Sequence, residues 1–233
     1  MINGINSREM ILEILLEIEE GEHSHVAIRN ALSKYQFLPK QDRAFITRVC
    51  EGTLEYRIQI DYIINSFSKV TVDKMKPAIR EILRSAVYQL KYMDSVPDSA
   101  VCNEAVKLAQ RKGFYNLKPF VNGVLRTIAR EMDQVRFPQK EDDLLKYLSV
   151  KYSMPEVLVT RWLEAYGEET TEKILADFLT EHPLTIRCRT YLNSKEEIIK
   201  SLESQGVHVA PAPYLPYAYS ISEFNHILAL DAF

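Results

Sequence analysis

Glycine is scarce in this sequence, and it never clusters. The seven glycines among 233 residues are all isolated from one another. In the common nucleotide-binding folds, a glycine-rich turn brings backbone amides close to the phosphates of the ligand. The sequence therefore predicts no loop able to wrap a nucleotide or S-adenosylmethionine, and we expect no cofactor to be bound by this chain.

Cysteine is scarcer still. The three cysteines, Cys50, Cys102 and Cys188, are far apart, and an odd number without paired spacing argues against a disulfide framework or a thiolate metal site. Each lies on an apolar-periodic face, which favours a buried small side chain over a nucleophile. We predict no catalytic residue and no metal site in this chain.

Long apolar runs are also missing. No stretch of about 18 apolar residues occurs, and the N-terminus MINGINSREM lacks the apolar core of a signal peptide. Neither secretion nor membrane spanning is supported. We expect a cytoplasmic protein without a membrane partner.

Negative charge is missing from one part of the chain, although the formal net charge is −3. Residues 1–140 hold 21 Lys and Arg against 17 Asp and Glu, whereas residues 141–233 hold 8 against 15. Residues 105–130, here called the basic window, contain no acid. The window holds three aromatic residues, Phe114, Tyr115 and Phe120, and the cations Lys107, Arg111, Lys112, Lys118, Arg126 and Arg130.

The basic window has two interpretations. Its cations could neutralise RNA phosphates while the interleaved aromatic rings stack on unpaired bases. Alternatively, the window is a solvated helix face whose charges only keep the protein soluble. The complete lack of acid favours RNA.

Helical periodicity dominates the first 136 residues. The apolar spacing and the stop signals predict seven helical segments. Ser7 is the expected N-cap of the first, and the fifth is expected at the centre of the bundle because its apolar face is unbroken. The last begins at Asn116 or in a first turn containing Pro119. The segments cover approximately residues 7–21, 24–37, 39–57, 61–67, 76–93, 96–113 and 118–131.

The last of these helices contains an unexpected dipeptide, Asn122 and Gly123. A glycine within a helix costs about 1 kcal/mol relative to alanine. The missing side chain of Gly123 would be explained if two helices crossed closely there. Asn122 could hydrogen-bond a buried backbone group or a group of an RNA.

Residues 139–182 continue as helix after the polar segment RFPQKEDD. Two short helices broken at Ser153 and Pro155 are followed by another from about Glu168 to Leu179. This region is predicted to be a helical linker.

The period then changes from helical to alternating. In LTIRCRT, three apolar residues (Leu184, Ile186 and Cys188) share one strand face, and Arg187 and Arg189 lie on the other. The two arginines could contact RNA phosphates or protect an edge strand from aggregation. A helix over 194–206 and strands in VHVAPAPY and AYSI follow, which predicts a small β-α-β unit.

The predicted fold class is mainly α, in three parts. Residues 1–138 form an all-helical domain, 139–182 the helical linker, and 183–233 a partial α/β subdomain. The last residues, HILALDAF, are apolar, which we interpret as the approach to a larger sheet or domain.

Several segments together resemble a known family. SREMILEIL, DRAFITRVCEGTLEYRIQID, AIREILRSAVYQLKYMDSVPDSAVCNEAVKLAQRKG and FVNGVLR are similar to the NusB domain, an all-helical RNA-binding module, over about residues 5–132. LSVKYSMPEVLVTRWLEAYG, PLTIRCRTYLNSKEEIIKSLESQGVHV and PYLPYAYSI resemble the segment that follows this domain in the Sun/Fmu family of 16S ribosomal RNA cytosine-C5 methyltransferases. There, an RRM-like β-α-β region precedes an S-adenosylmethionine-binding catalytic domain.

The resemblance implies roles for particular residues. It places RNA-facing positions at Arg8, Asn116 and Phe120. The catalytic cysteines of the family lie in Pro-Cys and Thr-Cys dipeptides, and none of the cysteines here has such a neighbour. The chain is therefore expected to lack the catalytic domain, while the parent enzyme uses S-adenosylmethionine.

These observations predict an RNA-recognition fragment of a small-subunit rRNA methyltransferase. A NusB-like antitermination factor that pairs with a ribosomal protein, or a helical scaffold without an RNA role, are the alternatives. The predicted RNA-binding residues are Arg8, Lys107, Arg111, Lys112, Asn116, Lys118, Phe120, Arg126, Arg187 and Arg189.

Overall fold

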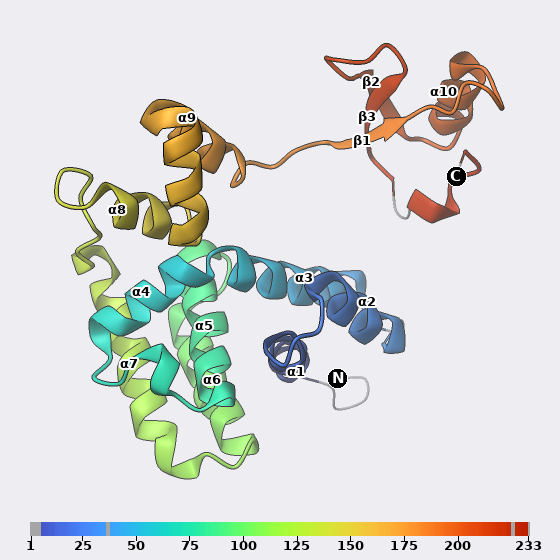
Figure 1. Cartoon of the computed structure of the whole chain (residues 1–233). Coiled ribbons are helices and arrows are strands. Elements are labelled where there is room, and N and C mark those ends of the chain that lie inside the picture. Colours follow the sequence, from blue (N-terminus) through green and yellow to red (C-terminus); the bar gives the residue numbers. More distant parts are fainter. Residues whose placement is uncertain (1–5, 36–37, 225–226, 233) are drawn as a thin grey trace. The chain divides into compact units, whose positions relative to one another are not determined.

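The computed structural model describes residues 6–35, 38–224 and 227–232 (Figure 1). The chain divides into two compact units, Met1–Phe178 and Leu179–Phe233. The first unit includes the helices that the sequence assigned to a linker. The three-part division at residues 138 and 182 stays a prediction, and the two units are described separately below.

The described residues of the first unit form helices joined by turns and loops, with no strand among them. None of the described helices is both long and apolar enough to cross a lipid bilayer. Short 3-10 turns lie at Val72–Lys74, Tyr115–Leu117 and Met132–Gln134. The α-helices are α1 (Ser7–Glu19), α2 (Ser24–Lys34), α3 (Lys40–Glu55), α4 (Arg57–Phe67), α5 (Pro77–Tyr92), α6 (Asp98–Arg111), α7 (Lys118–Glu131), α8 (Leu144–Lys151) and α9 (Glu156–Asp177).

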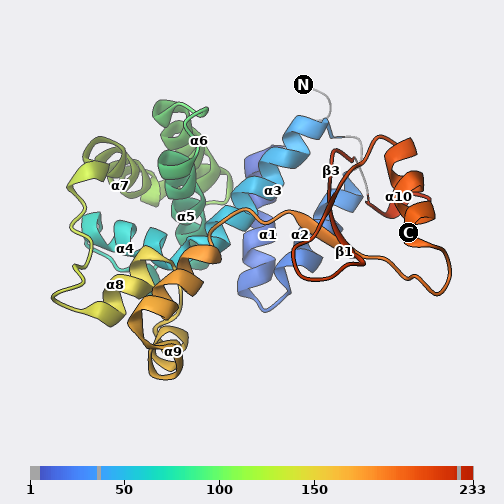
Figure 2. The same ribbon diagram turned by 90° about the horizontal axis from the view of Figure 1, so that it is seen from above.

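Helix α5 runs through the middle of the bundle, as its sequence predicts (Figure 2). Pro77 occupies its first turn, where the missing N–H has no intrahelical acceptor to lose. Helices α1, α3, α4, α6 and α7 all pack against it. Because α5 is approached from several sides, even Glu81, Ser85 and Gln89 are buried.

The glycine that allows a close contact is Gly52 in α3, not Gly123. A Cβ atom added to Gly52 would lie 2.0 Å from Cζ of Tyr88 on α5. Tyr88 is only 2% exposed, so its ring has no free space into which to move. A Cβ atom at Gly123 would meet nothing within 4 Å. The prediction of a close helix crossing at Gly123 is therefore wrong.

Helices α8 and α9 are attached to the bundle through α4. The amide N–H of Ile58 donates to Oγ of Ser153 at 3.0 Å. The Gln59 side chain donates to the carbonyl oxygens of Val150 and Lys151 at 3.1 and 3.2 Å. The two bonds from Gln59 satisfy carbonyl groups at the end of α8 that have no partners within the helix.

Several helix ends differ from the expectation. Asn6, not Ser7, caps α1, because its Oδ1 accepts from the N–H of Arg8 at 2.9 Å. The last helix of the bundle starts at Lys118 with Pro119 in its first turn, which confirms one of the two predicted alternatives, and Asn116 lies in the preceding 3-10 turn. Helix α2 ends at Lys34, and the predicted extension to Phe37 reaches outside the described residues.

The predicted helix break before Glu168 is present as a kink. Gly167 has φ 73° and ψ 174° within α9, and the helical path continues on both sides of it. A positive φ is accessible to glycine without steric cost. The break therefore separates two helical segments of one element.

The described residues of the second unit form a three-stranded antiparallel sheet, one α-helix and a short 3-10 turn at Ile227–Ala229. Strand order is β1-β3-β2, with β1 at Leu184–Arg187, β2 at His208–Pro211 and β3 at Ala218–Ser222. Helix α10 (Lys195–Ser204) begins with a capping box formed by Ser194 and Glu197. One sheet face and α10 share a small core of which Leu202 and Ile221 are members.

The strand prediction is partly wrong at β1. The strand ends at Arg187, so Cys188 and Arg189 both lie beyond it, and Leu184 at its start is exposed. Cys188 is buried as expected. The adjacent strand β3 is central in the sheet. Its Ile221, which is the register partner of Leu184, is deeply buried.

The two glycines give a matched test of the packing. We expect Gly52→Ala to lower the free energy of unfolding by about 1–3 kcal/mol, because the added methyl group overpacks a buried ring. Gly123→Ala should instead raise it by up to about 1 kcal/mol, because alanine favours helix and nothing obstructs its Cβ. Urea unfolding of both variants measures the two changes, and effects of equal sign would contradict this interpretation.

Candidate nucleic-acid interface

Helices α6 and α7 line an open groove on the surface of the first unit. It has a volume of about 560 Å³. Two of the predicted cations, Lys107 and Lys118, line it from opposite helices. The full lining is Asn103, Val106, Lys107, Gln110, Lys118, Pro119 and Asn122.

The helical period accounts for this lining. Asn103, Lys107 and Gln110 are spaced i, i+4 and i+7 on α6, which places them on one face. The opposite face of α6 buries Val101 and Leu108 in the core. Sequence reasoning missed Asn103 and Gln110. Their i, i+4 and i+7 spacing with Lys107 is the signal in the sequence that could have identified them.

The cations of the groove differ in their partners. Nζ of Lys107 lies 2.7 Å from Oε1 of Glu104, one turn back on the same helix. The hydrogen bond from Lys107 is the main reason that the pKa of Glu104 is below its ordinary value. Lys118 makes no ion pair within the described part of the chain, so its charge is available to a ligand.

Arg126 extends this surface along α7. Its Nε donates to Oδ1 of Asn122 at 2.9 Å, one helical turn away. The bond fixes the guanidinium without neutralising it, because an amide carries no charge. The remaining donors of Arg126 and the exposed Arg111 on α6 can therefore still contact an anion.

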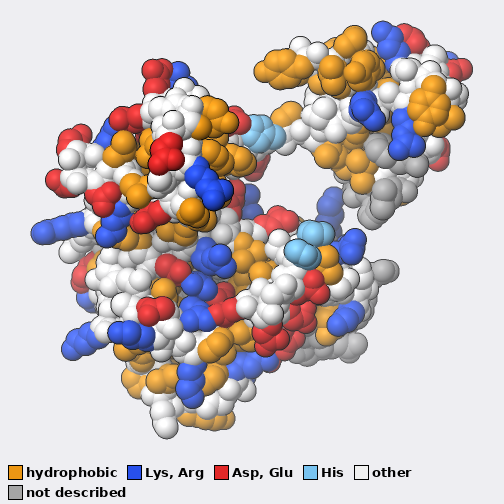
Figure 3. All heavy atoms as spheres, viewed as in Figure 1, with side chains coloured by type: hydrophobic (Ala, Val, Ile, Leu, Met, Phe, Trp, Pro, Cys, Tyr) orange, Lys and Arg blue, Asp and Glu red, His pale blue; other side chains and the backbone are white. Residues whose placement is uncertain are grey.

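The basic window is free of acid only along the sequence. Nζ of Lys112 lies 2.9 Å from Oε1 of Glu13 and 3.2 Å from Oε1 of Glu9, both on α1. These hydrogen bonds, the one to Glu13 first, raise the pKa of Lys112, and burial opposes the shift. Figure 3 shows the same mixing of acidic and basic side chains over the face of the first unit in view.

Arg8 is not among the residues that line the groove. Its guanidinium carbon is 5.3 Å from the centroid of the Phe45 ring, and its Nε is buried without a hydrogen-bond partner in the described structure. Partial burial lowers the pKa of Arg8, and the Glu104 carboxylate opposes that shift. Arg8 is thus half-buried against α3 instead of projecting beside Lys118.

The predicted stacking residues differ in exposure. Phe120 and Phe114 are partly buried against the main core, and Nζ of Lys76 lies 5.5 Å from the Phe114 ring centroid. Tyr115 is 61% exposed and therefore offers the one largely free ring of the three. Asn116, beside it, is also exposed.

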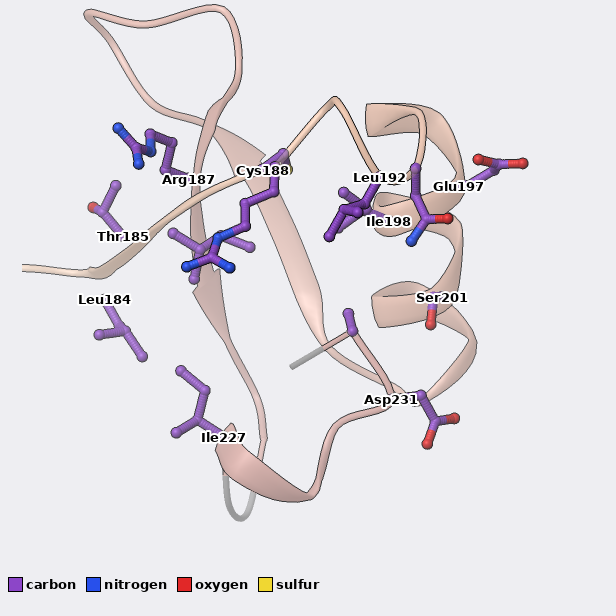
Figure 4. A pocket seen from close by; sticks show the side chains of 14 residues that line it. Leu184, Thr185, Arg187, Cys188, Leu192, Glu197, Ile198, Ser201, Ile227 and Asp231 are labelled. Carbon is purple, nitrogen blue, oxygen red and sulfur yellow. The ribbon is translucent and has the colours of Figure 1, made fainter.

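Arg187 and Arg189 belong to the other compact unit. Both are exposed and line a pocket of about 740 Å³ beside β1 (Figure 4). Ile198 of α10 also lines it, together with the carboxylates of Glu197 and Asp231. The sequence grouped these arginines with the cations of the basic window, whereas the structure separates them into different units.

The cysteines lie in the interior of the protein, and none of them lines the groove. Cys50, Cys102 and Cys188 are all buried and free. Burial is the main cause that raises the pKa of each thiol, which disfavours the reactive thiolate. Over the described residues, no three His, Cys, Asp or Glu side chains come together as a metal site.

Comparison with known proteins finds matches to two family models. The NusB family matches residues 5–130, which is more than half of the chain. The chain belongs to the NusB family. A second match, to the ferredoxin-like domain of RsmF/B-like methyltransferases, covers residues 154–227.

The curated relatives are of two kinds. A probable ribosomal RNA small subunit methyltransferase B of Bacillus subtilis is 32% identical over 87% of this chain and 44% of its own length. Its Synechocystis counterpart is 30% identical over 91% of this chain and 47% of its own length. The transcription antitermination protein NusB of Dictyoglomus thermophilum is 33% identical, but over 55% of this chain and 85% of its own length.

These comparisons confirm the family resemblance predicted from the sequence. The chain spans about half the length of the methyltransferase relatives that it matches. The crystal structure of PH0851 shares the fold, with a TM-score of 0.69 at 22% identity over 99% of this chain and 52% of that chain. The predicted mainly α fold class with a small α/β part is likewise confirmed, and the structure adds that the sheet is antiparallel.

The position of Lys112 leads to a stability prediction. We expect Lys112→Gln to lower the free energy of unfolding by at most about 1 kcal/mol at pH 7 and low salt, because its ion pairs are partly exposed. The folded-state pKa of Lys112 is raised. The stabilisation is therefore present below the unfolded pKa of lysine, about 10.4, and is lost as pH rises through the folded value.

Urea unfolding at several pH values and salt concentrations measures this loss. Lys107→Gln is the control, since Lys107 pairs only within α6 and its pair is worth about 0.2–0.5 kcal/mol. A Lys112→Gln effect that does not diminish with added salt would show that the ion pairs to α1 are not its cause.

Proposed function

We propose that this chain is the RNA-binding part of a ribosomal RNA methyltransferase that modifies C5 of a cytosine in the small-subunit (16S) RNA. The observation that carries the proposal is the extent of the similarity. Relatives named ribosomal RNA small subunit methyltransferase B match 87% and 91% of this chain, across both compact units. Its own residues bind and orient RNA.

The α6–α7 groove supports binding by charge and by hydrogen bonding. Lys118 and Arg126 carry positive charges without a carboxylate partner among the described residues. Such charges release counterions when they meet phosphates, which drives association. The amides of Asn103 and Gln110 between them offer donors and acceptors to sugar or base groups.

Methyl transfer is proposed for the longer protein, with S-adenosylmethionine as the donor, as in the resembling family. The residues described here do not fit that cofactor. The sheet is antiparallel and three-stranded, and neither pocket contains the glycine-rich turn that approaches such a ligand. No step of the transfer is assigned to this chain, and a cytoplasmic location is proposed from the family alone.

A second candidate function is that of a NusB-type antitermination factor. The observation in its favour is the 33% identity to NusB proteins over 85–95% of their lengths. The match of residues 154–227 to an RsmF/B-like domain favours the methyltransferase, because the NusB relatives account for only 54–55% of the chain.

Salt-dependent RNA binding tests the proposal. We expect the double variant Lys118→Gln and Arg126→Gln to bind a small-subunit rRNA fragment more weakly, with the slope of log K against log salt reduced by about 1.4–1.8 for two lost phosphate contacts. Fluorescence anisotropy over a salt series measures both quantities.

A matched control removes two charges elsewhere in the same unit. Lys146 of α8 and Arg161 of α9 are exposed, and Lys146→Gln with Arg161→Gln changes the net charge by the same amount. If both double variants reduce the slope equally, the binding follows net charge and the groove is not the site.

A further inference from the structure

One end of the sheet in the second unit gathers residues from two separate loops. Arg187 at the end of β1 pairs with Ala218 at the start of β3. The N–H of Cys188 donates to the carbonyl oxygen of Tyr217 at 2.9 Å. The chain that leaves β1 and the β2–β3 connection therefore lie together at this end.

This end exposes a large amount of aromatic and aliphatic surface. The side chain of Tyr214 is 90% exposed and that of Tyr191 is 78% exposed. Figure 3 shows hydrophobic side chains gathered on the second unit. We call this the sheet-end patch, and it consists of Tyr191, Leu192, Tyr214, Leu215 and Tyr217. Exposed aromatic and aliphatic residues on two loops that meet at one end of a sheet are candidates for contact with a partner.

Positive charge borders the sheet-end patch. Arg187 and Arg189 are exposed and make no ion pair within the residues that the structure describes. The segments 182–195 and 204–222 contain no acidic residue, although residues 141–233 are acidic overall. An anionic partner is therefore favoured over a basic one.

Two carboxylates line the neighbouring pocket, and among the described residues neither makes an ion pair with Arg187 or Arg189. Glu197 accepts from the N–H and Oγ of Ser194 in the capping box, both at 2.9 Å. Asp231 lies beside Ser201, on the other side of the pocket from Arg187 (Figure 4).

The loop that presents Tyr214 is held in shape. Prolines at positions 211, 213 and 216 restrict its backbone. The N–H of Ala212 donates to the carbonyl oxygen of Ala218 at 3.0 Å, and the N–H of Ala218 donates to that of Leu215 at 3.1 Å. A fixed loop loses little conformational entropy when it binds, so exposed rings on it are suited to recognition.

The open face of the sheet itself is not a stacking surface. The strand register places Ala210, Ser220 and Thr185 on the face away from the α10 core. RRM domains stack bases on aromatic residues of the sheet face. The aromatic rings here lie instead at the end of the sheet, beside two cations.

We propose that the sheet-end patch binds unpaired nucleotides of an RNA, with Tyr214 and Tyr191 stacking on bases and Arg187 and Arg189 neutralising the adjoining phosphates. Stacking on tyrosine is tolerant of base identity, and the arginines supply affinity for any phosphate backbone. This inference rests on the proposed function and adds a second contact for single-stranded RNA to the α6–α7 groove.

The test uses the full chain and two fluorescent RNAs, a 12-nucleotide uridine-rich single strand and a hairpin duplex. We expect Tyr214→Ala to weaken single-strand binding at least fivefold, the lower end of about 1–3 kcal/mol per stacked base, and to leave duplex binding unchanged. Tyr214→Phe, which keeps the ring, should bind as the unaltered chain does. Tyr166→Ala is the matched control, because Tyr166 is 57% exposed on α9.

The arginines give an independent readout. Arg187→Gln and Arg189→Gln together should reduce the single-strand salt slope by about 1.4, whereas Tyr214→Ala should leave the slope unchanged. Equal effects of Tyr214→Ala and Tyr166→Ala, or equal losses for single strand and duplex, overturn the proposal. Loss of binding in Tyr214→Phe overturns stacking.

The two proposals can fail separately. If Tyr214→Ala has no effect while Lys118→Gln with Arg126→Gln weakens binding, the result supports RNA binding by the groove and rejects RNA binding by the sheet-end patch. The reverse result leaves the sheet-end patch as the binding surface and removes the groove.

Discussion

The contact between Gly52 of α3 and the ring of Tyr88 on α5 is the constraint on which the helical bundle depends. It lets the two helices approach closer than any side chain would permit. Tyr88 is fully enclosed, and its ring centroid lies 5.4 Å from that of Tyr92 and 6.4 Å from that of Tyr56. Tyr92 in turn hydrogen-bonds Gln59, which holds the end of α8. One absent methyl group thus positions α3, α5 and, through α4, the helices that follow.

The same core sets the geometry of the groove. Buried residues on α6 and α7, such as Leu108, Val121 and Leu125, fix these helices in the bundle core. The polar faces that remain must then face each other across a gap whose width is set by the core and not by the ligand. A site on packed helices is held more rigidly than one on loops. The Arg84 guanidinium adds to this rigidity because it pairs with Asp61 on α4 and with Glu81 in the core, each at 2.6 Å.

Sequence reasoning recovered what depends on local pattern. The apolar period of α5 predicts both its helix and its central place, and Gly167 marks a real break. Sequence reasoning failed for features that depend on contacts between residues distant along the chain. Whether a glycine is needed depends on what packs above it, which is why Gly52 was overlooked and Gly123 chosen. The acids that meet Lys112 come from α1, about a hundred positions away, and the central position of β3 depends on strand order, which no window of sequence shows.

The number of cations in a segment therefore overstates its capacity to bind an anion, because some of these cations are already paired with carboxylates. The basic window contains six cations, but a phosphate that approaches Lys112 must compete with two carboxylates, and one that approaches Lys107 must displace Glu104. Breaking the existing ion pair of such a lysine costs free energy, which offsets part of the gain from its contact with a phosphate. These residues therefore contribute less to affinity than their number suggests. Arg130 is likewise paired, with Glu131 at 2.6 Å. Cations without an ion pair in the described structure include Lys118, Arg126 and Arg111 in one unit and Arg187 and Arg189 in the other, and these are the residues for which phosphate binding is proposed. Since phosphate contacts carry no sequence information, selectivity for a particular RNA has to come from the neighbouring amides and tyrosines.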